Sequence, residues 1–209
     1  MKKVDLQTLQ AVLNNELDTQ TISGRALLDR FRLIDEDSRK TAPYLDHRYA
    51  PFYYYLGKHV EPKSMMEIGF SIGLLSASFL TSCKTVESFL GYTESGLDFM
   101  PIRIGKSNIK LKFKGEANFH VGSLHDQEFL DIFSPNQWDL VILNDETVYD
   151  KHLEYLDTAW PHVSEHGLIV AEYIDRHIPA RDAFHAFCKS KNRQPMVFNT
   201  RYGTGLLQK

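Results

Sequence analysis

Apolar residues near the start of this 209-residue chain recur at helical spacing. Leucines punctuate residues 6–17 behind Asp5, and apolar residues repeat the pattern over residues 27–34 behind Ser23. Because Asp and Ser are preferred helix caps, both segments predict amphipathic helices ahead of the first strand. Their periodicity fits two roles equally: packing on a core or covering a substrate pocket.

From residue 64 onward, short apolar runs alternate with helical patterns. The predicted strands cover residues 64–67, 86–92, 117–122, 138–143, 168–173, 196–199 and 204–208. The predicted helices between them cover residues 74–80, 129–133, 151–160 and 180–189. Such alternation is typical of an α/β domain with a mostly parallel sheet. The near-continuous apolar run at 138–143 predicts a central strand that is buried on both faces.

The pattern between residues 95 and 115 is ambiguous. Pro101 and Gly105 interrupt a long helix, while apolar residues 109, 111 and 113 alternate with lysines 110, 112 and 114. Strict alternation favours an exposed strand with a basic face. Such lysines usually form a solvated edge that discourages pairing with another strand, and an anion-binding role is the less favoured interpretation.

Composition narrows the class of protein. With 43% hydrophobic residues the chain can form one domain with a sizeable core, and its net charge of −3 gives no general attraction to nucleic acid or anionic membranes. We therefore expect a small-molecule partner. Cys83 and Cys188 are far apart and suit a reducing compartment. The first residues lack a signal-peptide core, and no apolar run approaches the roughly 20 residues of a membrane span, so we expect a cytoplasmic protein.

One stretch, Ser-Met-Met-Glu-Ile-Gly-Phe-Ser-Ile-Gly, reads as strand, tight loop and helix start. Gly69 and Gly73 bracket Phe70 and Ser71, and Glu67 lies two residues before the first glycine. Glycines tolerate positive φ and let the backbone approach a ligand, at which the amides of the following helix point. The spacing is not the G-x-G-x-x-G of dinucleotide sites, and the Gly-Lys-Ser/Thr of a P-loop is absent.

This Glu-Ile-Gly-Phe-Ser-Ile-Gly loop resembles the first motif, E/D-x-G-x-x-x-G, of class I S-adenosylmethionine-dependent methyltransferases. Weaker similarities follow in the family's order at residues 121–124, 142–145 and 167–170, so that the resemblance covers about residues 55–209. It implies a Rossmann-like three-layer sandwich with a mostly parallel seven-stranded sheet, an antiparallel C-terminal hairpin strand and added N-terminal helices. It also divides the chain into an N-terminal helical extension (1–60) and a methyltransferase domain (61–209). The family usually has a helix within residues 95–115.

The resemblance implies S-adenosylmethionine as the cofactor and assigns residues to it. The loop would wrap the methionine and ribose end, and the acid after the second strand would bind the ribose hydroxyls. That acid is Glu94, which stands one position later than usual. Thr93 occupies the usual position. The predicted cofactor-binding residues are Glu67, Gly69, Phe70, Ser71, Gly73, Thr93, Glu94, Gly122, Ser123, Leu124, Asn144 and Asp145.

The end of the fourth strand is closest to small-molecule O-methyltransferases, in which this strand ends I-D-G-x-H. Asp145 matches the aspartate, but Glu146 replaces the glycine and no histidine stands at the matching position. We predict Asp145 and His125 as catalytic residues, with Asp145 the better supported general base. His152 and His177 remain further candidates.

A divalent metal is not predicted. Some members hold one between an aspartate here and an Asp-Asn pair after the fifth strand, but the matching residues are Asp145, Glu172 and Tyr173. A tyrosine in the third place removes a ligand that a hard cation prefers.

Two functions fit these features. The first is methyl transfer from S-adenosylmethionine to a small-molecule hydroxyl or amine. The second is a non-catalytic S-adenosylmethionine-binding regulatory or scaffold protein, suggested by the altered residues after Asn144 and the displaced Glu94. Another enzyme on this fold, such as an aminopropyl transferase, is a third candidate. The acceptor would meet the N-terminal helices, the aromatic stretch 44–55 and the loop at 175–177. The N-terminal helices could cap the site or form a homodimer interface.

Overall fold

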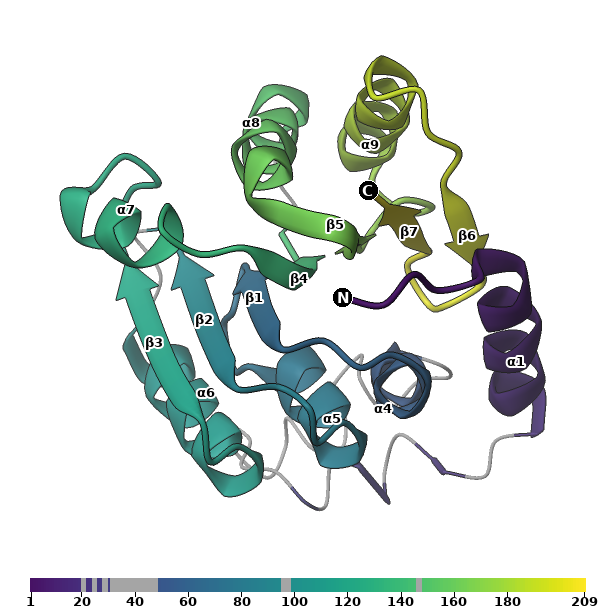
Figure 1. Cartoon of the computed structure of the whole chain (residues 1–209), viewed down its shortest axis with the longest axis horizontal. Helices are drawn as coiled ribbons and strands as arrows, with labels where there is room; N and C mark the ends of the chain where they lie inside the picture. Colours follow the sequence, from purple (N-terminus) through teal and green to yellow (C-terminus); the bar gives the residue numbers. More distant parts are fainter. Residues whose placement is uncertain (20–21, 24–25, 28–29, 31–48, 95–98, 146–147) are drawn as a thin grey trace.

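The computed structural model describes residues 1–19, 22–23, 26–27, 30, 49–94, 99–145 and 148–209. A seven-stranded sheet is covered by helices on both faces (Figure 1). The strands are β1 (Ser64–Ile68), β2 (Ser88–Thr93), β3 (Glu116–Val121), β4 (Trp138–Leu143), β5 (Val163–Ala171), β6 (Met196–Phe198) and β7 (Thr204–Gln208). The helices are α1 (Leu6–Thr19), α4 (Tyr49–His59), α5 (Leu74–Ser82), α6 (Phe99–Lys112), α7 (Gln127–Phe133), α8 (Tyr149–Ala159) and α9 (Ile178–Ser190), with a short 3-10 turn, η2 (Trp160–His162).

The strand order is β3-β2-β1-β4-β5-β7-β6. Strands β1 to β5 pair in parallel, whereas β7 is antiparallel to both β5 and β6. The predicted mostly parallel sheet with an antiparallel C-terminal strand is therefore confirmed. Strands β2 and β3 lie on one side of β1 and β4 lies on the other, so the strand order reverses between β1 and β4. In open α/β sheets ligands bind beyond the carboxyl ends of the strands at such a point.

The two faces of the sheet form two separate hydrophobic cores. Along β4, Leu140 and Ile142 face the core beneath α4, α5 and α6, whereas Val141 and Leu143 face the core beneath α7, α8 and α9. Figure 1 shows these two groups of helices on opposite sides of the sheet. Because both faces are covered, the central strand has no polar side, which explains its near-continuous apolar sequence.

Helix α1 begins as the sequence predicts. The Asp5 carboxylate accepts hydrogen bonds from the backbone N–H of Gln7 and from the side chain of Thr8. The leucines of its inner face are buried, and the helix packs on α4 and β6. The second predicted helix, 27–34, falls almost wholly outside the described residues. Among the described residues, no helix has both the length and the apolar character needed to cross a membrane.

The structure decides the ambiguous segment within residues 95–115 in favour of a helix. Residues 99–112 form helix α6, as the family resemblance implied. Ile109 and Phe113 are buried, while Leu111 between them is 51% exposed. The two buried residues are four apart, a spacing that satisfies both strand and helix periodicity, so the short pattern could not separate them.

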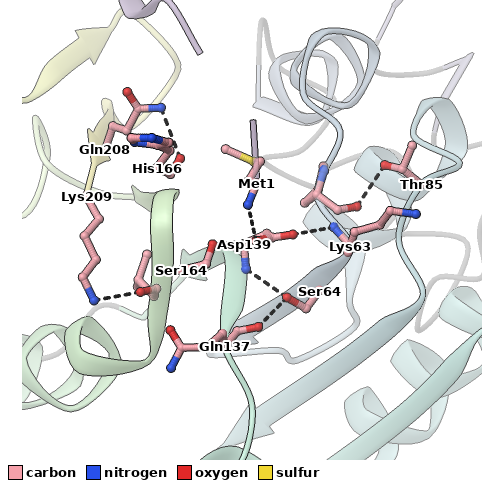
Figure 2. A network of polar contacts seen from close by, with 12 residues as sticks. Met1, Lys63, Ser64, Thr85, Gln137, Asp139, Ser164, His166, Gln208 and Lys209 are labelled. Atoms are coloured by element: carbon pink, nitrogen blue, oxygen red, sulfur yellow. Dashed lines mark hydrogen bonds and ion pairs between the residues drawn. The ribbon is translucent and has the colours of Figure 1, made fainter. Parts of the chain in front are cut away.

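At the opposite edge of the sheet from the carboxyl ends, Asp139 organises a polar network (Figure 2). Its carboxylate accepts hydrogen bonds from the Met1 ammonium at 3.1 Å, the Lys63 backbone N–H at 2.7 Å and the Ser164 hydroxyl at 2.5 Å. The Ser64 hydroxyl in turn accepts from the Asp139 backbone N–H. These contacts join the starts of β1, β4 and β5 to one another and to Met1.

Candidate functional site

The loop between β1 and α5 has a backbone that only certain residues can adopt. The φ angles of Gly69 and Gly73 are 80° and 63°, and that of Ser71 is 43°. A β-carbon on Gly69 would lie 2.1 Å from the carbonyl oxygen of Asn144. Glycine is therefore required there because the loop presses against the end of β4. The loop lies where the strand order reverses, between β1 and β4.

The Phe70 side chain is part of the core. Its ring is 2% exposed and contacts Phe89 and Phe119 at centroid distances of 5.7 and 5.3 Å. It occupies space left by glycines: a β-carbon on Gly73 or Gly105 would lie 2.6 or 2.7 Å from this ring. Phe70 therefore anchors the loop to the sheet and to α6.

A cavity of about 110 Å³ lies between this loop and the end of β4. Its lining comprises residues 69–75 together with Tyr49, Asn144 and Tyr173. Sites for whole small-molecule ligands usually measure about 300–1,000 Å³. The cavity is therefore large enough for only one end of such a ligand.

Two buried carboxylates lie behind the cavity. Glu67 at the end of β1 is fully buried and accepts hydrogen bonds from the backbone N–H and hydroxyl of Ser76. Its other oxygen accepts from the Asn144 amide at 3.3 Å. Burial raises the pKa of Glu67 to about 8, although the hydrogen bonds from Ser76 and Asn144 oppose the rise. The predicted anchoring acid thus ties β1, α5 and β4 together.

Glu172, after β5, is the second buried carboxylate. It accepts hydrogen bonds from the Tyr53 hydroxyl at 2.5 Å and the Thr204 hydroxyl at 2.9 Å, both at Oε1. Its Oε2 has no hydrogen-bond partner among the described residues. Burial raises the pKa of Glu172 to about 7. Its position is therefore that of a structural acid joined to α4 and β7.

Helix α4 sends two tyrosines to the carboxyl edge of the sheet. Tyr49 donates to the Asn144 side chain at 3.0 Å, and Tyr53, four residues on, donates to Glu172. Residues four apart lie on one helix face, which is why both reach this edge. Burial raises the pKa of both hydroxyls well above the ordinary value, so they remain neutral donors. The sequence indicated an aromatic wall, but it did not single out these two hydroxyls; Asp46, His47 and Arg48 lie outside the described residues.

The end of β2 carries the displaced acid. The Glu94 carboxylate accepts a hydrogen bond from the Tyr155 hydroxyl at 2.9 Å and pairs with Lys151 at 3.0 Å. Both partners come from α8, and sequence reasoning missed them. Thr93 beside it is 1% exposed, and its hydroxyl has no partner among the described residues. The predicted ribose-binding position thus contains one acid that α8 holds in place and one unpaired hydroxyl.

The loop after β3 is closed by Asp126. Its carboxylate accepts from the Ser123 backbone N–H at 2.7 Å and lies 3.1 Å from His120 Nε2. A β-carbon on Gly122 would lie 2.1 Å from the same carboxylate. Leu124 is buried in the core beneath α7 and α8. Of the three residues predicted here, Ser123 therefore has its amide occupied and Leu124 has its side chain in the core.

The predicted catalytic residues lie in different places. Asp145 is half-buried at the end of β4, with its β-carbon 3.2 Å from the position that a Gly69 β-carbon would take. His125 has a 78% exposed side chain and pairs with Glu154 of α8 at 3.1 Å. His152 of α8 is fully buried, and burial lowers its pKa to about 4. Asp145 is thus beside the glycine loop, whereas His125 belongs to the loop after β3.

In the part of the chain that the structure describes, no group of three or more His, Cys, Asp or Glu residues is arranged so that it could hold a metal ion. Tyr173 occupies the third position with a φ of 66°, which is uncommon for a bulky residue. It lines the cavity in place of an oxygen ligand.

The sequence matches no protein-family model and no curated protein. Solved structures, however, match over nearly the whole chain. The O-methyltransferase TomG from Streptomyces achromogenes, in complex with S-adenosylmethionine, is 13% identical with a TM-score of 0.64, and the match covers 98% of each chain. The methyltransferase PaMTH1 from Podospora anserina, bound to S-adenosylhomocysteine, is 12% identical with a TM-score of 0.64, over 99% of this chain and 97% of its own.

The O-methyltransferase from Bacillus cereus, also in complex with S-adenosylhomocysteine, is 12% identical with a TM-score of 0.57; the match covers 100% of this chain and 93% of that one. The fold is that of the class I methyltransferases. At these identities the likeness establishes the fold alone.

Proposed function

We propose that the protein is an S-adenosylmethionine-dependent methyltransferase that acts on a hydroxyl or amine of a small-molecule acceptor. One observation carries this proposal: the glycine loop lies at the reversal point of the sheet and forms a cavity with the end of β4. Structural neighbours TomG and PaMTH1 are described with S-adenosylmethionine and S-adenosylhomocysteine bound.

The residues at this edge fit such a cofactor. The loop backbone and Asn144 would hold its methionine end, Thr93 and Glu94 its ribose, and the 122–124 segment its adenine. The buried Thr93 hydroxyl has no hydrogen-bond partner among the described residues. When bound, the cofactor supplies a methyl group already activated on a sulfonium. The protein's own task is then to orient the acceptor and to exclude water.

Asp145 is our candidate for the general base. Its β-carbon lies beside the Gly69 position, and this closeness to the proposed methionine end supports a role in taking the proton from an acceptor hydroxyl during transfer. His125, the second candidate, is paired with Glu154 and would have to leave that carboxylate in order to act. Tyr49 would contribute as a neutral hydrogen-bond donor, since its pKa is raised by burial.

A second function has specific support. Both oxygens of Glu94 already have partners on α8, and the Ser123 amide is occupied by Asp126. This favours a non-catalytic cofactor-binding regulatory or scaffold protein as the alternative.

Calorimetry with S-adenosylmethionine, S-adenosylhomocysteine and NAD tests both functions. We expect both sulfur compounds to bind with Kd values below about 1 mM, equivalent to about −4 kcal/mol or better, and NAD not to bind. If neither sulfur compound binds in that range, both the methyltransferase and the non-catalytic binder are excluded.

Substitution of Asp145 then separates catalysis from binding. In Asp145→Asn we expect cofactor affinity within about two-fold of the wild type and methyl transfer to a panel of phenols and amines lowered at least about 100-fold. His125→Asn is the matched control and should lower transfer less than about three-fold. Equal transfer by wild type and Asp145→Asn would refute the role of Asp145, and transfer lost only in His125→Asn would reassign the base.

A further inference from the structure

Tyr202, in the turn between β6 and β7, is surrounded by aromatic rings and arginines. Its ring is 7% exposed and stacks on Tyr173 at a centroid distance of 5.2 Å, with Tyr49 edge-on at 5.7 Å. The guanidinium carbons of Arg176 and Arg201 lie 5.0 and 5.2 Å from the same ring centroid. We call these five residues the Tyr202 cluster.

The backbone holds this cluster in place. The Tyr202 carbonyl accepts hydrogen bonds from the N–H of Asp175 at 3.0 Å and of Arg176 at 3.3 Å. The Gly203 carbonyl accepts from Ile174 in the same way. The loop after β5 is therefore fixed to the β6–β7 turn, so that Arg176 is tied to the ring that it covers.

The cluster is continuous with the cavity at the glycine loop. Tyr49 and Tyr173 both contact Tyr202, and both line the cavity together with Asn144 and residues 69–75. Tyr173 adopts its left-handed φ of 66° at this junction. Such conformations in bulky residues are costly and cluster at ligand sites. The path from the proposed methionine end to the two arginines thus consists of aromatic side chains.

The arginines make this path positively charged in a chain whose net charge is −3. Arg176 is exposed, and it forms no ion pair with a carboxylate of the described residues; the ion pair nearby joins Arg181 to Asp182 instead. A guanidinium presents a planar fork of donors that matches carboxylates and phosphates. Its guanidinium carbon lies over the Tyr202 ring at a distance typical of a cation–π contact.

We propose that the Tyr202 cluster binds an acceptor that carries an oxyanion, either a carboxylate or a phosphate, next to an aromatic ring. Arg176 pairs with the oxyanion, and Tyr49 and Tyr173 contact the ring, which directs the acceptor's hydroxyl toward the glycine loop. This inference rests on the proposed methyltransferase function, whose acceptor class it specifies.

Binding of small probes tests the inference directly. The probes are 4-hydroxybenzoate, its neutral analogue 4-hydroxybenzamide, and phenyl phosphate, each titrated by NMR at fixed ionic strength with and without S-adenosylhomocysteine. We expect an oxyanion probe to bind at least about five-fold more tightly than the amide, as a charge-assisted contact at a partly exposed site would give. The tighter of the two anions identifies the oxyanion.

Arg176→Gln should remove this preference, so that anionic and neutral probes bind within about two-fold of each other. Arg176→Lys keeps the charge without the fork and should retain an intermediate preference. Arg193→Gln, at an exposed arginine after α9, is the matched control and should keep the full preference. The thermal midpoint of each variant verifies that it is folded.

The inference is overturned if wild type binds the anions and the amide equally, if the preference survives in Arg176→Gln, or if no probe binds below about 10 mM. Failure of the proposed methyltransferase function would give a different binding result. In that case S-adenosylhomocysteine does not bind to wild type, whereas the probe titrations without it still decide whether the cluster recognises an oxyanion.

Discussion

At the scale of single residues, Gly69 fixes the geometry of the site. It combines a φ of 80° with a β-carbon position only 2.1 Å from the Asn144 carbonyl oxygen. The sequence identified this glycine from its spacing, but the partner that excludes a side chain comes from a strand more than 70 residues later in the chain. Ser71 in the same loop also has a positive φ, without such an overlap at its own position.

Gly69→Ala should therefore destabilise the protein by at least about 3 kcal/mol, because backbone must move to relieve the overlap. Ser71→Gly is the matched change in the same loop and should alter stability by less than about 1 kcal/mol, since glycine adopts positive φ readily. Urea unfolding followed by circular dichroism measures both. A Gly69→Ala protein as stable as Ser71→Gly would contradict the close contact with β4.

The protonation of Glu67 makes the stability of the folded protein depend on pH. Burial raises its pKa from about 4.5 to about 8, so between these values the folded protein keeps a proton that the unfolded chain has released. The unfolded state then binds fewer protons, and stability falls as the pH rises through this window. Glu172 adds the same trend up to about pH 7.

We expect the thermal midpoint of the wild type to fall between pH 5 and pH 8 by more than that of Glu67→Gln, whose amide does not titrate. Differential scanning calorimetry across this range measures the two slopes. Glu87→Gln, which replaces an exposed carboxylate, is the control and should keep the wild-type slope. Parallel curves for all three proteins would show that Glu67 is ionised throughout.

At the scale of elements, α6 supports the glycine loop. The Asn108 amide donates to the Ile72 carbonyl at 3.0 Å, and a β-carbon on Gly105 would lie 2.6 Å from the Ser71 carbonyl oxygen. Local pattern left this segment undecided between strand and helix because it has a proline, a glycine and alternating lysines. The helix exists because its buried face packs on Phe70 and the loop, which local periodicity does not contain.

The substitution Gly105→Ala separates the effect of helix propensity on stability from the effect of packing against the glycine loop. Helix propensity alone predicts a gain of about 1 kcal/mol, whereas the overlap with Ser71 and Phe70 predicts a loss of about 1–3 kcal/mol. We expect a net loss in the free energy of unfolding, together with weaker S-adenosylhomocysteine binding by calorimetry. Lys110→Ala, at an exposed position of the same helix, should change stability by less than about 0.5 kcal/mol. A stabilised Gly105→Ala protein would show that α6 does not press on the loop.

At the scale of the whole molecule, the two edges of the sheet have different roles. The carboxyl edge holds the glycine loop, the buried acids and the Tyr202 cluster. The amino edge holds the Asp139 network (Figure 2). Burial alone would raise the pKa of Asp139, but hydrogen bonds from Ser164 and Lys63 and the Met1 ammonium outweigh burial and lower it. This stability is present above the ordinary pKa near 3.8 and is lost as the pH falls through the lowered value.

Asp139→Asn should lower the free energy of unfolding by about 1–3 kcal/mol at pH 7, because it removes an ion pair and weakens buried hydrogen bonds. The difference from wild type should begin to shrink as the pH falls below about 3.8 and should be lost only below the lowered pKa of the folded protein, where Asp139 is also neutral. S-adenosylhomocysteine affinity should stay within about two-fold, since the substitution lies at the opposite edge. Denaturant unfolding at several pH values and calorimetry measure these effects. A constant difference at all pH values would exclude the ionised Asp139 as its source.

The sequence by itself determined which runs are buried on both faces and where the glycine loop falls, whereas the antiparallel C-terminal strand was implied only by the family resemblance. These features are carried by neighbouring residues, whose periodicity and spacing are local. The acid at Glu67 and the polar end of β4 could be predicted for the same reason. The predicted homodimer and the division at residue 60 stay predictions.

Only the tertiary structure decided which side chains meet. Two hydrogen bonds join residues that are distant in sequence: Tyr49 donates to Asn144, and Tyr53 donates to Glu172. Glu94 is likewise bound by Lys151 and Tyr155 of α8. The Tyr202 cluster likewise joins three separate loops and helices. Such contacts depend on how the elements pack rather than on any local pattern, and they determine which polar groups remain free for a ligand.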